Sequence, residues 1–250
     1  MENPVRNPNS NGLLRGADLT NIFAALRANA PKHIDAPVNN TEYNTANEIK
    51  RISPEKFAKI LEKEGVSKRY ILKKQAGEID YDVGLLKYHS EAMKSIADGK
   101  VIMLLGEVGR GKSFLAYNCI YEFKRSNPMD IRTFCSRASL IVSDYKANYS
   151  NLEYIIKKIF NPSSYWYEEG DVNTQLVVID ELHNLKPTDY DVISEIVIHA
   201  YETLTPLFLI GNYSQKHLKE SLAENAISRI LENCIAFKVD GEDLRVAGLR

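Results

Sequence analysis

The residues from Gly106 to Ser113 have the types and spacing needed to hold phosphate groups, because they read GEVGRGKS. Glycines let the backbone curl so that its N–H groups face phosphate oxygens, and the positive N-terminal end of a following helix strengthens the attraction. Lys112 can reach the β- and γ-phosphates of a nucleotide, and Ser113 can ligate Mg²⁺. The pattern predicts a P-loop that binds ATP together with Mg²⁺.

The neighbours of this loop favour that interpretation over a glycine-rich turn that binds nothing. The apolar run Val101–Leu105 precedes the loop and is typical of a buried strand, and residues 112–124 have the pattern of a helix. The candidate ATP-contacting residues are Gly106, Glu107, Val108, Gly109, Arg110, Gly111, Lys112, Ser113 and Phe114.

Two adjacent carboxylates form a second candidate site. Leu176–Glu181 reads LVVIDE, which is four apolar residues followed by two acids. Ligands bind at the carboxyl ends of the strands in a parallel sheet. We expect Asp180 to hold the Mg²⁺ shell and Glu181 to orient or activate the attacking water. The alternative is an ordinary strand-to-loop junction with two exposed acids, which the accompanying phosphate loop makes the weaker interpretation.

A polar amide ends another apolar run, Pro206–Asn212, which reads PLFLIGN. The side chain of Asn212 can donate and accept hydrogen bonds without adding charge, so it suits a position beside phosphate or water. The alternative is that Gly211 and Asn212 only make a turn.

Strands and helices alternate from about residue 84, which predicts an α/β fold with a parallel five-stranded sheet between helices. We expect strands at residues 101–105, 131–135, 176–179, 207–210 and 235–239. We expect helices at residues 85–97, 112–124, 139–149, 152–160, 190–203, 215–222 and 223–232.

The chain before the sheet divides into two segments of different composition. Residues 1–49 are rich in Asn, Ala and Pro, and we predict a flexible N-terminal region with one short helix at residues 19–30. Residues 50–84 are predicted to be a basic helical linker, with Ser53 as the N-cap of a helix that ends near Gly65. Nine basic residues against three acids lie from Lys50 to Lys74, either as a solvated face or as a contact for an acidic protein or nucleic acid.

Composition excludes several classes of protein. The net charge of −1 says nothing about partners, and no apolar run approaches the roughly 18 residues that would span a bilayer. The N-terminus has no apolar signal segment, so we expect a cytoplasmic protein. The three cysteines lack metal-site spacing and are predicted to be buried thiols.

Residues 65–250 resemble the DnaC/DnaI-type helicase loaders and the related IstB ATPases, which are AAA+ proteins of the ASCE branch. The resemblance rests on five segments, which read GVSKRY from Gly65, GEVGRGKS, LVVIDEL, LIGN and SRI from Ser228. The predicted strand at residues 131–135 lies in sequence between the two motif strands, as in the ASCE branch. One departure is Leu182–Asn184, where loaders commonly have a glycine-containing turn. We expect His183 there to be a lone exposed histidine, the alternative being a proton-sensing role.

The resemblance implies an ATPase, residues 85–250, that loads a hexameric replicative helicase onto single-stranded DNA. It places Asn212 at the sensor 1 position and makes Arg229 an arginine finger that acts on ATP held by a neighbouring subunit, so the protein would self-associate through its ATP sites. The alternative for Arg229 is a surface arginine paired to Glu224 or Glu232. Too few residues follow Arg229 for the helical lid of most AAA+ proteins, and the loader family is known for a reduced lid. The segment 1–49 would bind the helicase, with residues 50–74 as the other candidate.

The resemblance also implies a DNA-contacting segment between the second and third strands. There, aromatic and basic side chains suit base stacking and phosphate neutralisation, although they could equally form a half-buried helix face. These residues are Phe134, Arg137, Tyr145, Lys146 and Tyr149. Two rival functions remain open: an IstB-like transposition helper ATPase that binds DNA and a transposase, and a nucleotide-binding adaptor that does not hydrolyse ATP.

Overall fold

The described residues form one parallel sheet covered by helices on both faces. The computed structural model describes residues 52–78, 83–125, 128, 131–161, 173–212, 221–240 and 243, all of which belong to one compact unit that spans residues 42–250. The predicted helix at residues 19–30, the N-terminal region 1–49 and most of the predicted helix at residues 215–222 lie outside the described residues.

The five strands lie in the order β2-β3-β4-β1-β5, and all neighbouring pairs are parallel. Their bounds are β1 Val101–Leu105, β2 Arg132–Arg137, β3 Thr174–Asp180, β4 Leu207–Gly211 and β5 Cys234–Lys238. In space, therefore, β4 separates the two motif strands β1 and β3, whereas β2, the strand that lies between them in sequence, is at the edge. The predicted α/β P-loop architecture is confirmed.

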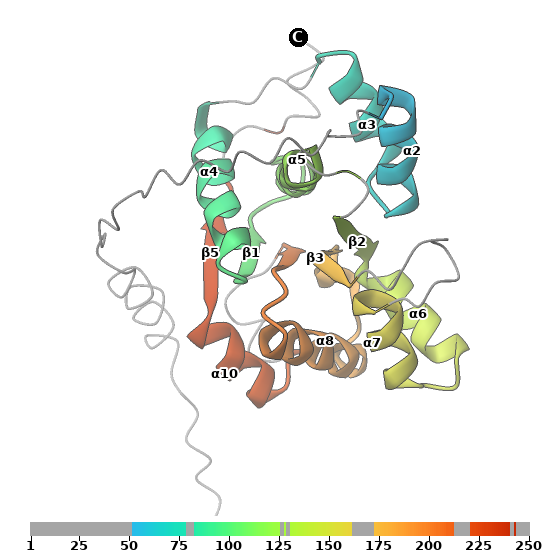
Figure 1. Cartoon of the computed structure of the whole chain (residues 1–250). Helices are drawn as coiled ribbons and strands as arrows, with labels where there is room; N and C mark the ends of the chain where they lie inside the picture. Colours follow the sequence, from blue (N-terminus) through green and yellow to red (C-terminus); the bar gives the residue numbers. More distant parts are fainter. Residues whose placement is uncertain are drawn as a thin grey trace, which may run out of the picture. The chain divides into compact units, whose positions relative to one another are not determined.

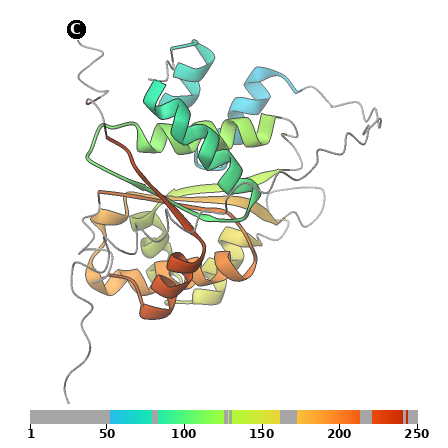
Figure 2. The same ribbon diagram turned by 90° about the vertical axis from the view of Figure 1, so that its left-hand side faces the viewer.

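The helices make two layers, one on each side of the sheet (Figures 1 and 2). One layer contains α2 Pro54–Lys63, α3 Lys68–Gln75, α4 Val83–Ala97 and α5 Lys112–Arg125. The other contains α6 Ala138–Ala147, α7 Leu152–Phe160, α8 Tyr190–Glu202 and α10 Glu224–Glu232. Two 3₁₀ turns, η1 Leu182–Asn184 and η2 Pro187–Asp189, connect β3 to α8.

Alternate strand residues fill two separate apolar cores, as the period of a β-strand requires. In β1, Val101 and Met103 face the core beneath α8, while Ile102 and Leu104 face the core shared with α5. Each of these four side chains is at most 1% exposed. Strands buried on both faces explain the continuous apolar runs in the sequence.

The segment with α2 and α3 packs into the second of these cores. As predicted, Ser53 caps α2: its Oγ accepts a hydrogen bond from the backbone N–H of Lys56 at 3.2 Å, and the helix ends before Gly65. Gly65 has a φ of 93°, and a Cβ atom there would lie 1.8 Å from the carbonyl oxygen of Cys135. Only glycine permits this approach of the α2–α3 turn to β2.

A buried ion pair reinforces that contact. Lys124 of α5 is fully buried and donates a 2.8 Å hydrogen bond to Glu64 Oε1, and Thr133 of β2 donates its backbone N–H to Glu64 Oε2 at 3.2 Å. Burial lowers the pKa of the Lys124 ammonium, and the neighbouring Glu64 carboxylate opposes that shift. The pair ties the α2–α3 turn to both α5 and the sheet edge.

No helix within the described ranges is long and apolar enough to cross a membrane. Cys119 and Cys135 are buried as predicted, Cys234 is partly buried, and none of the three forms a disulfide. Burial raises the pKa of the Cys135 thiol to about 12, which makes it unreactive at neutral pH.

Candidate nucleotide-binding site

The phosphate loop, residues 106–111, connects the carboxyl end of β1 to the start of α5. Its three glycines all have positive φ: 141° at Gly106, 83° at Gly109 and 82° at Gly111. At Gly106 a Cβ atom would lie 2.3 Å from the carbonyl oxygen of Val239, so a larger residue would displace the loop from β5. The glycines expected from the motif therefore make a loop conformation that other residues rarely adopt.

Lys112 is the first residue of α5, its ammonium contacts the loop backbone, and it is only 7% exposed. Its ammonium donates hydrogen bonds to the carbonyl oxygens of Gly106 at 2.7 Å and Glu107 at 2.6 Å, and to Asn212 Oδ1 at 2.9 Å. These three acceptors match the three protons of the ammonium. The charge is thus held in place by the loop and by the end of β4.

Ser113 and the first acid of the pair lie in direct contact. Ser113 Oγ donates a 2.6 Å hydrogen bond to Asp180 Oδ2, and the backbone N–H of Glu181 donates to Asp180 Oδ1 at 2.7 Å. Burial raises the pKa of the Asp180 carboxyl, while the hydrogen bond from Ser113 acts in the opposite direction. A hydroxyl beside a carboxylate is the kind of oxygen set that Mg²⁺ prefers, so these two residues fit the ion expected from the motif.

Glu181 is held in an unusual backbone conformation. Its φ of 58° and ψ of 34° lie in the left-handed region, which is uncommon for a residue other than glycine. Its side chain is half-buried, and Asn184 Nδ2 lies 3.4 Å from Glu181 Oε2. Such conformations gather at functional sites, where the surrounding fold maintains them.

Asn212 connects the loop to the turn that follows the acidic pair. Its Oδ1 accepts from Lys112, and its Nδ2 lies 3.3 Å from His183 Nε2. The expectation of a lone exposed His183 is wrong, because the ring is half-buried and lies against Asn212. The position of His183 shortly after Asp180 was the signal that could have placed it near the site.

The remaining predicted loop residues lie at the rim. Val108 is 51% exposed, and Arg110 forms a 2.5 Å ion pair with the exposed Glu107. Phe114 is half-buried, and its ring lies 5.7 Å from that of the fully buried Tyr70 on α3. The α3 helix thus supports the first turn of α5.

Arg229 is not brought together with these residues. It lies on α10 shortly before β5 begins, at the amino edge of the sheet, whereas the phosphate loop follows the carboxyl end of β1. Its guanidinium pairs with Glu232 at 3.6 Å and lies 4.9 Å from the ring centre of Tyr201. The pairing with Glu232 is one that the sequence left open as an alternative role for this arginine.

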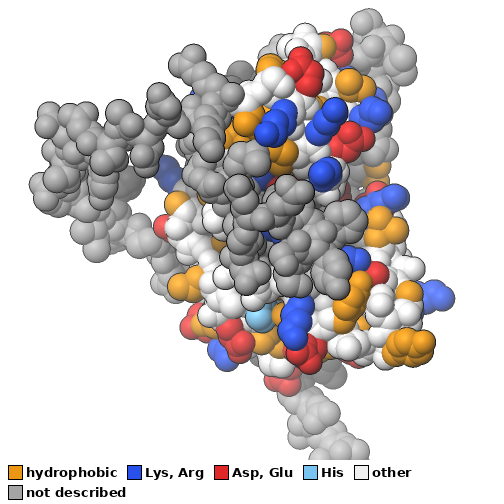
Figure 3. Space-filling model, turned by 45° about the vertical axis from the view of Figure 1, so that its right-hand side comes forward, with side chains coloured by type: hydrophobic (Ala, Val, Ile, Leu, Met, Phe, Trp, Pro, Cys, Tyr) orange, Lys and Arg blue, Asp and Glu red, His pale blue; other side chains and the backbone are white. Residues whose placement is uncertain are grey.

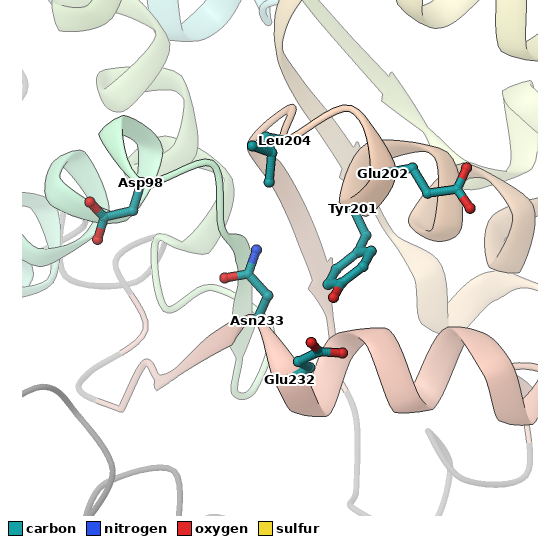
Figure 4. A pocket seen from close by; sticks show the side chains of 6 residues that line it. All are labelled: Asp98, Tyr201, Glu202, Leu204, Glu232 and Asn233. Carbon is teal, nitrogen blue, oxygen red and sulfur yellow. The ribbon is translucent and has the colours of Figure 1, made fainter.

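A pocket of about 520 Å³ is lined in part by Tyr201 and Glu232, the two residues that contact Arg229 (Figure 4 shows the lining). Its lining comes from the ends of α4, α8 and α10 and comprises Asp98, Tyr201, Glu202, Leu204, Glu232 and Asn233. Three of these six side chains are acidic, so the surroundings of Arg229 are negatively charged.

The five residues proposed to contact DNA have different environments. Phe134 and Tyr145 pack against the core, and Lys146 pairs with Asp189 at 2.7 Å. Arg137 is exposed, and Tyr149 is 99% exposed with a φ of 57°. On the face drawn in Figure 3, basic side chains are interspersed with acidic and apolar ones and form no single patch among the coloured residues.

Comparison with known proteins identifies the fold. No family model and no curated protein sequence match the chain. A crystal structure of the DnaC helicase loader matches 70% of this chain and 100% of its own, with a TM-score of 0.54 and 19% identity.

Two structures of the replication initiator DnaA match over a similar region. AMPPCP-bound DnaA from Aquifex aeolicus covers 71% of this chain, with a TM-score of 0.51 and 14% identity. DnaA bound to AMPPCP and single-stranded DNA also covers 71%, with a TM-score of 0.50 and 16% identity. The match spans about half of each DnaA chain, 52% in both cases. The chain therefore has the P-loop fold of AAA+ proteins, and its resemblance to DnaC extends from sequence motifs to three-dimensional structure.

Proposed function

We propose that this protein is an ATPase that loads a hexameric replicative helicase onto single-stranded DNA. The meeting of Lys112 and Ser113 with Asp180 and Asn212 at one edge of the sheet carries the proposal. A phosphate loop alone supports only binding, whereas an adjacent acidic pair and a polar amide supply groups for hydrolysis. The match to the full length of the DnaC chain supports the loader role over other ATPase roles.

Different residues of the site would hold the phosphates of ATP and the Mg²⁺ ion. The loop N–H groups and Lys112 would hold the phosphates, and Ser113 and Asp180 would hold the ion. Bound Mg²⁺ supplies positive charge that offsets the charge of the reacting phosphates. Glu181 would hold the attacking water and accept its proton, and Asn212 would hydrogen-bond to the terminal phosphate or to that water.

Arg229 would complete the site of a neighbouring copy. At 43% exposure its side chain is accessible, and its place at the amino edge puts it beyond reach of its own loop. A guanidinium placed against the transferred phosphoryl group neutralises developing charge and accelerates hydrolysis. Hydrolysis would then depend on assembly, which suits a loader that releases its cargo only once assembled.

Residues 1–49 would bind the helicase, and the exposed Tyr149 and Arg137 would contact single-stranded DNA by stacking and phosphate neutralisation. A co-purification experiment tests the loader role. The full chain and a chain lacking residues 1–49 are each used to capture the replicative helicase of the same replication system. We expect only the full chain to retain the helicase, with ATP binding equal in both. Capture of a transposase instead would replace the loader by an IstB-like helper.

A further inference from the structure

His183 faces Asn212 with both nitrogens of its ring. Nδ1 lies 3.4 Å from the backbone nitrogen of Asn212, and Nε2 lies 3.3 Å from the side-chain Nδ2. The histidine belongs to η1, directly after the acidic pair, and the asparagine follows β4. The two contacts therefore connect the turn after the acidic pair to the end of β4.

Lys112 determines which way the Asn212 amide points. An ammonium can only donate hydrogen bonds, so the atom that Asn212 presents to it at 2.9 Å must be the oxygen Oδ1. The amide nitrogen, which can only donate, is then turned towards His183 Nε2. The backbone N–H of Asn212 donates to His183 Nδ1 at 3.4 Å, so Nδ1 is the accepting nitrogen and the proton of the neutral ring is on Nε2.

The contact between Nε2 and Nδ2 cannot be a hydrogen bond in that state. Both groups only donate, so the ring satisfies only one of its two contacts. Turning the Asn212 amide by half a rotation about its terminal torsion resolves the conflict. Oδ1 then accepts from Nε2–H, and the unprotonated Nδ1 accepts the backbone N–H.

In the turned state, the NH₂ group of Asn212 replaces its oxygen on the side of Lys112. Two groups that only donate cannot face each other, so the turn requires Lys112 to move away from Asn212. A terminal amide torsion is broad and roughly two-fold, which makes both orientations accessible. The ring proton stays on Nε2 in both orientations, so the turn needs no proton transfer.

We propose that His183 is a positioning residue that holds Asn212 as a donor towards the terminal phosphate of ATP once Lys112 has turned to the phosphates. This inference depends on the proposed ATP-binding function. It assigns a role to the histidine that stands where loaders commonly have a glycine-containing turn. It also predicts that nucleotide binding creates a hydrogen bond from His183 Nε2–H to Asn212 Oδ1.

NMR of the Nε2–H group in the full chain tests this directly, because the resonance of a ring N–H proton moves downfield when the proton gains an acceptor. The chain has five histidines, and the spectrum of His183→Gln identifies the signal of His183. We expect the proton on Nε2 throughout, with its resonance moved downfield by Mg²⁺-AMPPCP and not by Mg²⁺-ADP. Bound AMPPCP with an unmoved Nε2–H resonance would overturn the role of His183 alone. A wild-type chain that fails to bind AMPPCP would overturn the ATP function as well.

Two variants extend the test to affinity. His183→Phe keeps an aromatic ring but cannot donate to Asn212, and we expect the preference for ATP over ADP to fall about tenfold. His183→Gln can still donate and accept, and should keep most of that preference. His199→Phe is the matched control, because His199 lies on α8 and its half-buried ring has its centre 4.5 Å from that of Phe160. An unchanged preference for ATP over ADP in a folded His183→Phe would contradict the proposal. A preference that is weaker in His183→Gln than in His183→Phe would also contradict it.

Discussion

The hydroxyl of Ser113 donates a 2.6 Å hydrogen bond to the carboxylate of Asp180, which joins two motifs that are 67 residues apart in sequence. The contact arises because β1 and β3 are parallel, with β4 between them, so that both motifs follow carboxyl ends of strands. Burial raises the pKa of Asp180 despite this hydrogen bond. Folding therefore favours the protonated form of the Asp180 carboxyl, so a negative charge on Asp180 reduces stability.

Replacement of Asp180 by Asn should stabilise the nucleotide-free chain at neutral pH. A carboxyl whose pKa is raised by folding binds its proton more tightly in the folded state, so stability falls as the pH rises from about 3.9 through the raised value. Asp180→Asn removes this loss, and we expect the free energy of unfolding at pH 7 to increase. The gain should shrink below pH 4, while ATP hydrolysis is lost. Urea unfolding between pH 3.5 and 8 measures the gain. A loss of stability that is equal at every pH would contradict the assignment.

Replacement of Arg229 by Ala should separate ATP binding from hydrolysis. We expect unchanged ATP affinity and at least about a 100-fold loss of turnover in the assembled protein. Arg125→Ala is the matched control, because Arg125 is also exposed and also pairs with a glutamate three residues away at 3.6 Å. Turnover assays at several protein concentrations would show the loss. Full turnover in Arg229→Ala would refute the arginine finger.

Mixing two inactive variants tests whether Arg229 acts on a neighbouring copy. In a mixture of Arg229→Ala with Glu181→Gln, some interfaces combine an intact phosphate-loop site with an intact arginine from the other chain. We expect partial recovery of ATP turnover in the mixture and none in either variant alone. ATP turnover in the mixture no higher than in either variant alone would show that Arg229 does not act in trans.

Replacement of Lys124 by Met tests how much the ion pair between Glu64 and Lys124 stabilises the folded chain. The change leaves the Glu64 carboxylate buried without its cation, and we expect a loss of roughly 3–5 kcal/mol in the free energy of unfolding. Lys146→Met, which breaks a pair whose lysine is 58% exposed, should cost no more than about 1 kcal/mol. Urea denaturation of both variants makes the comparison. Equal losses would mean that the Glu64–Lys124 pair contributes no more than a surface pair.

The sequence predicted the elements of this fold better than their arrangement. Local patterns were sufficient for the five strands and for the start of α2 at Ser53 and Pro54, since each depends on neighbouring residues. The order of strands, with β4 between β1 and β3, depends on contacts between distant residues that periodicity does not encode. The helix α3 was expected only as part of a helical linker, because its sequence KRYILKKQ has a weak apolar stripe.

The site could be predicted where a motif defines both spacing and chemistry, as for Lys112 and Ser113. The contact between His183 and Asn212 could not, because it joins residues 29 apart through the ends of two different strands. The position of Arg229 at the opposite edge of the sheet likewise follows from the direction of α10 into β5 and not from its motif.

Titration of Mg²⁺-ATP into the purified chain is the most direct test of the central claim that the phosphate loop binds ATP. We predict saturable binding by the wild-type chain, the same affinity in Lys157→Ala, an exposed lysine of α7, and at least about a 100-fold loss of affinity in Lys112→Ala. Equal ATP affinity in Lys112→Ala and the wild-type chain would contradict the account.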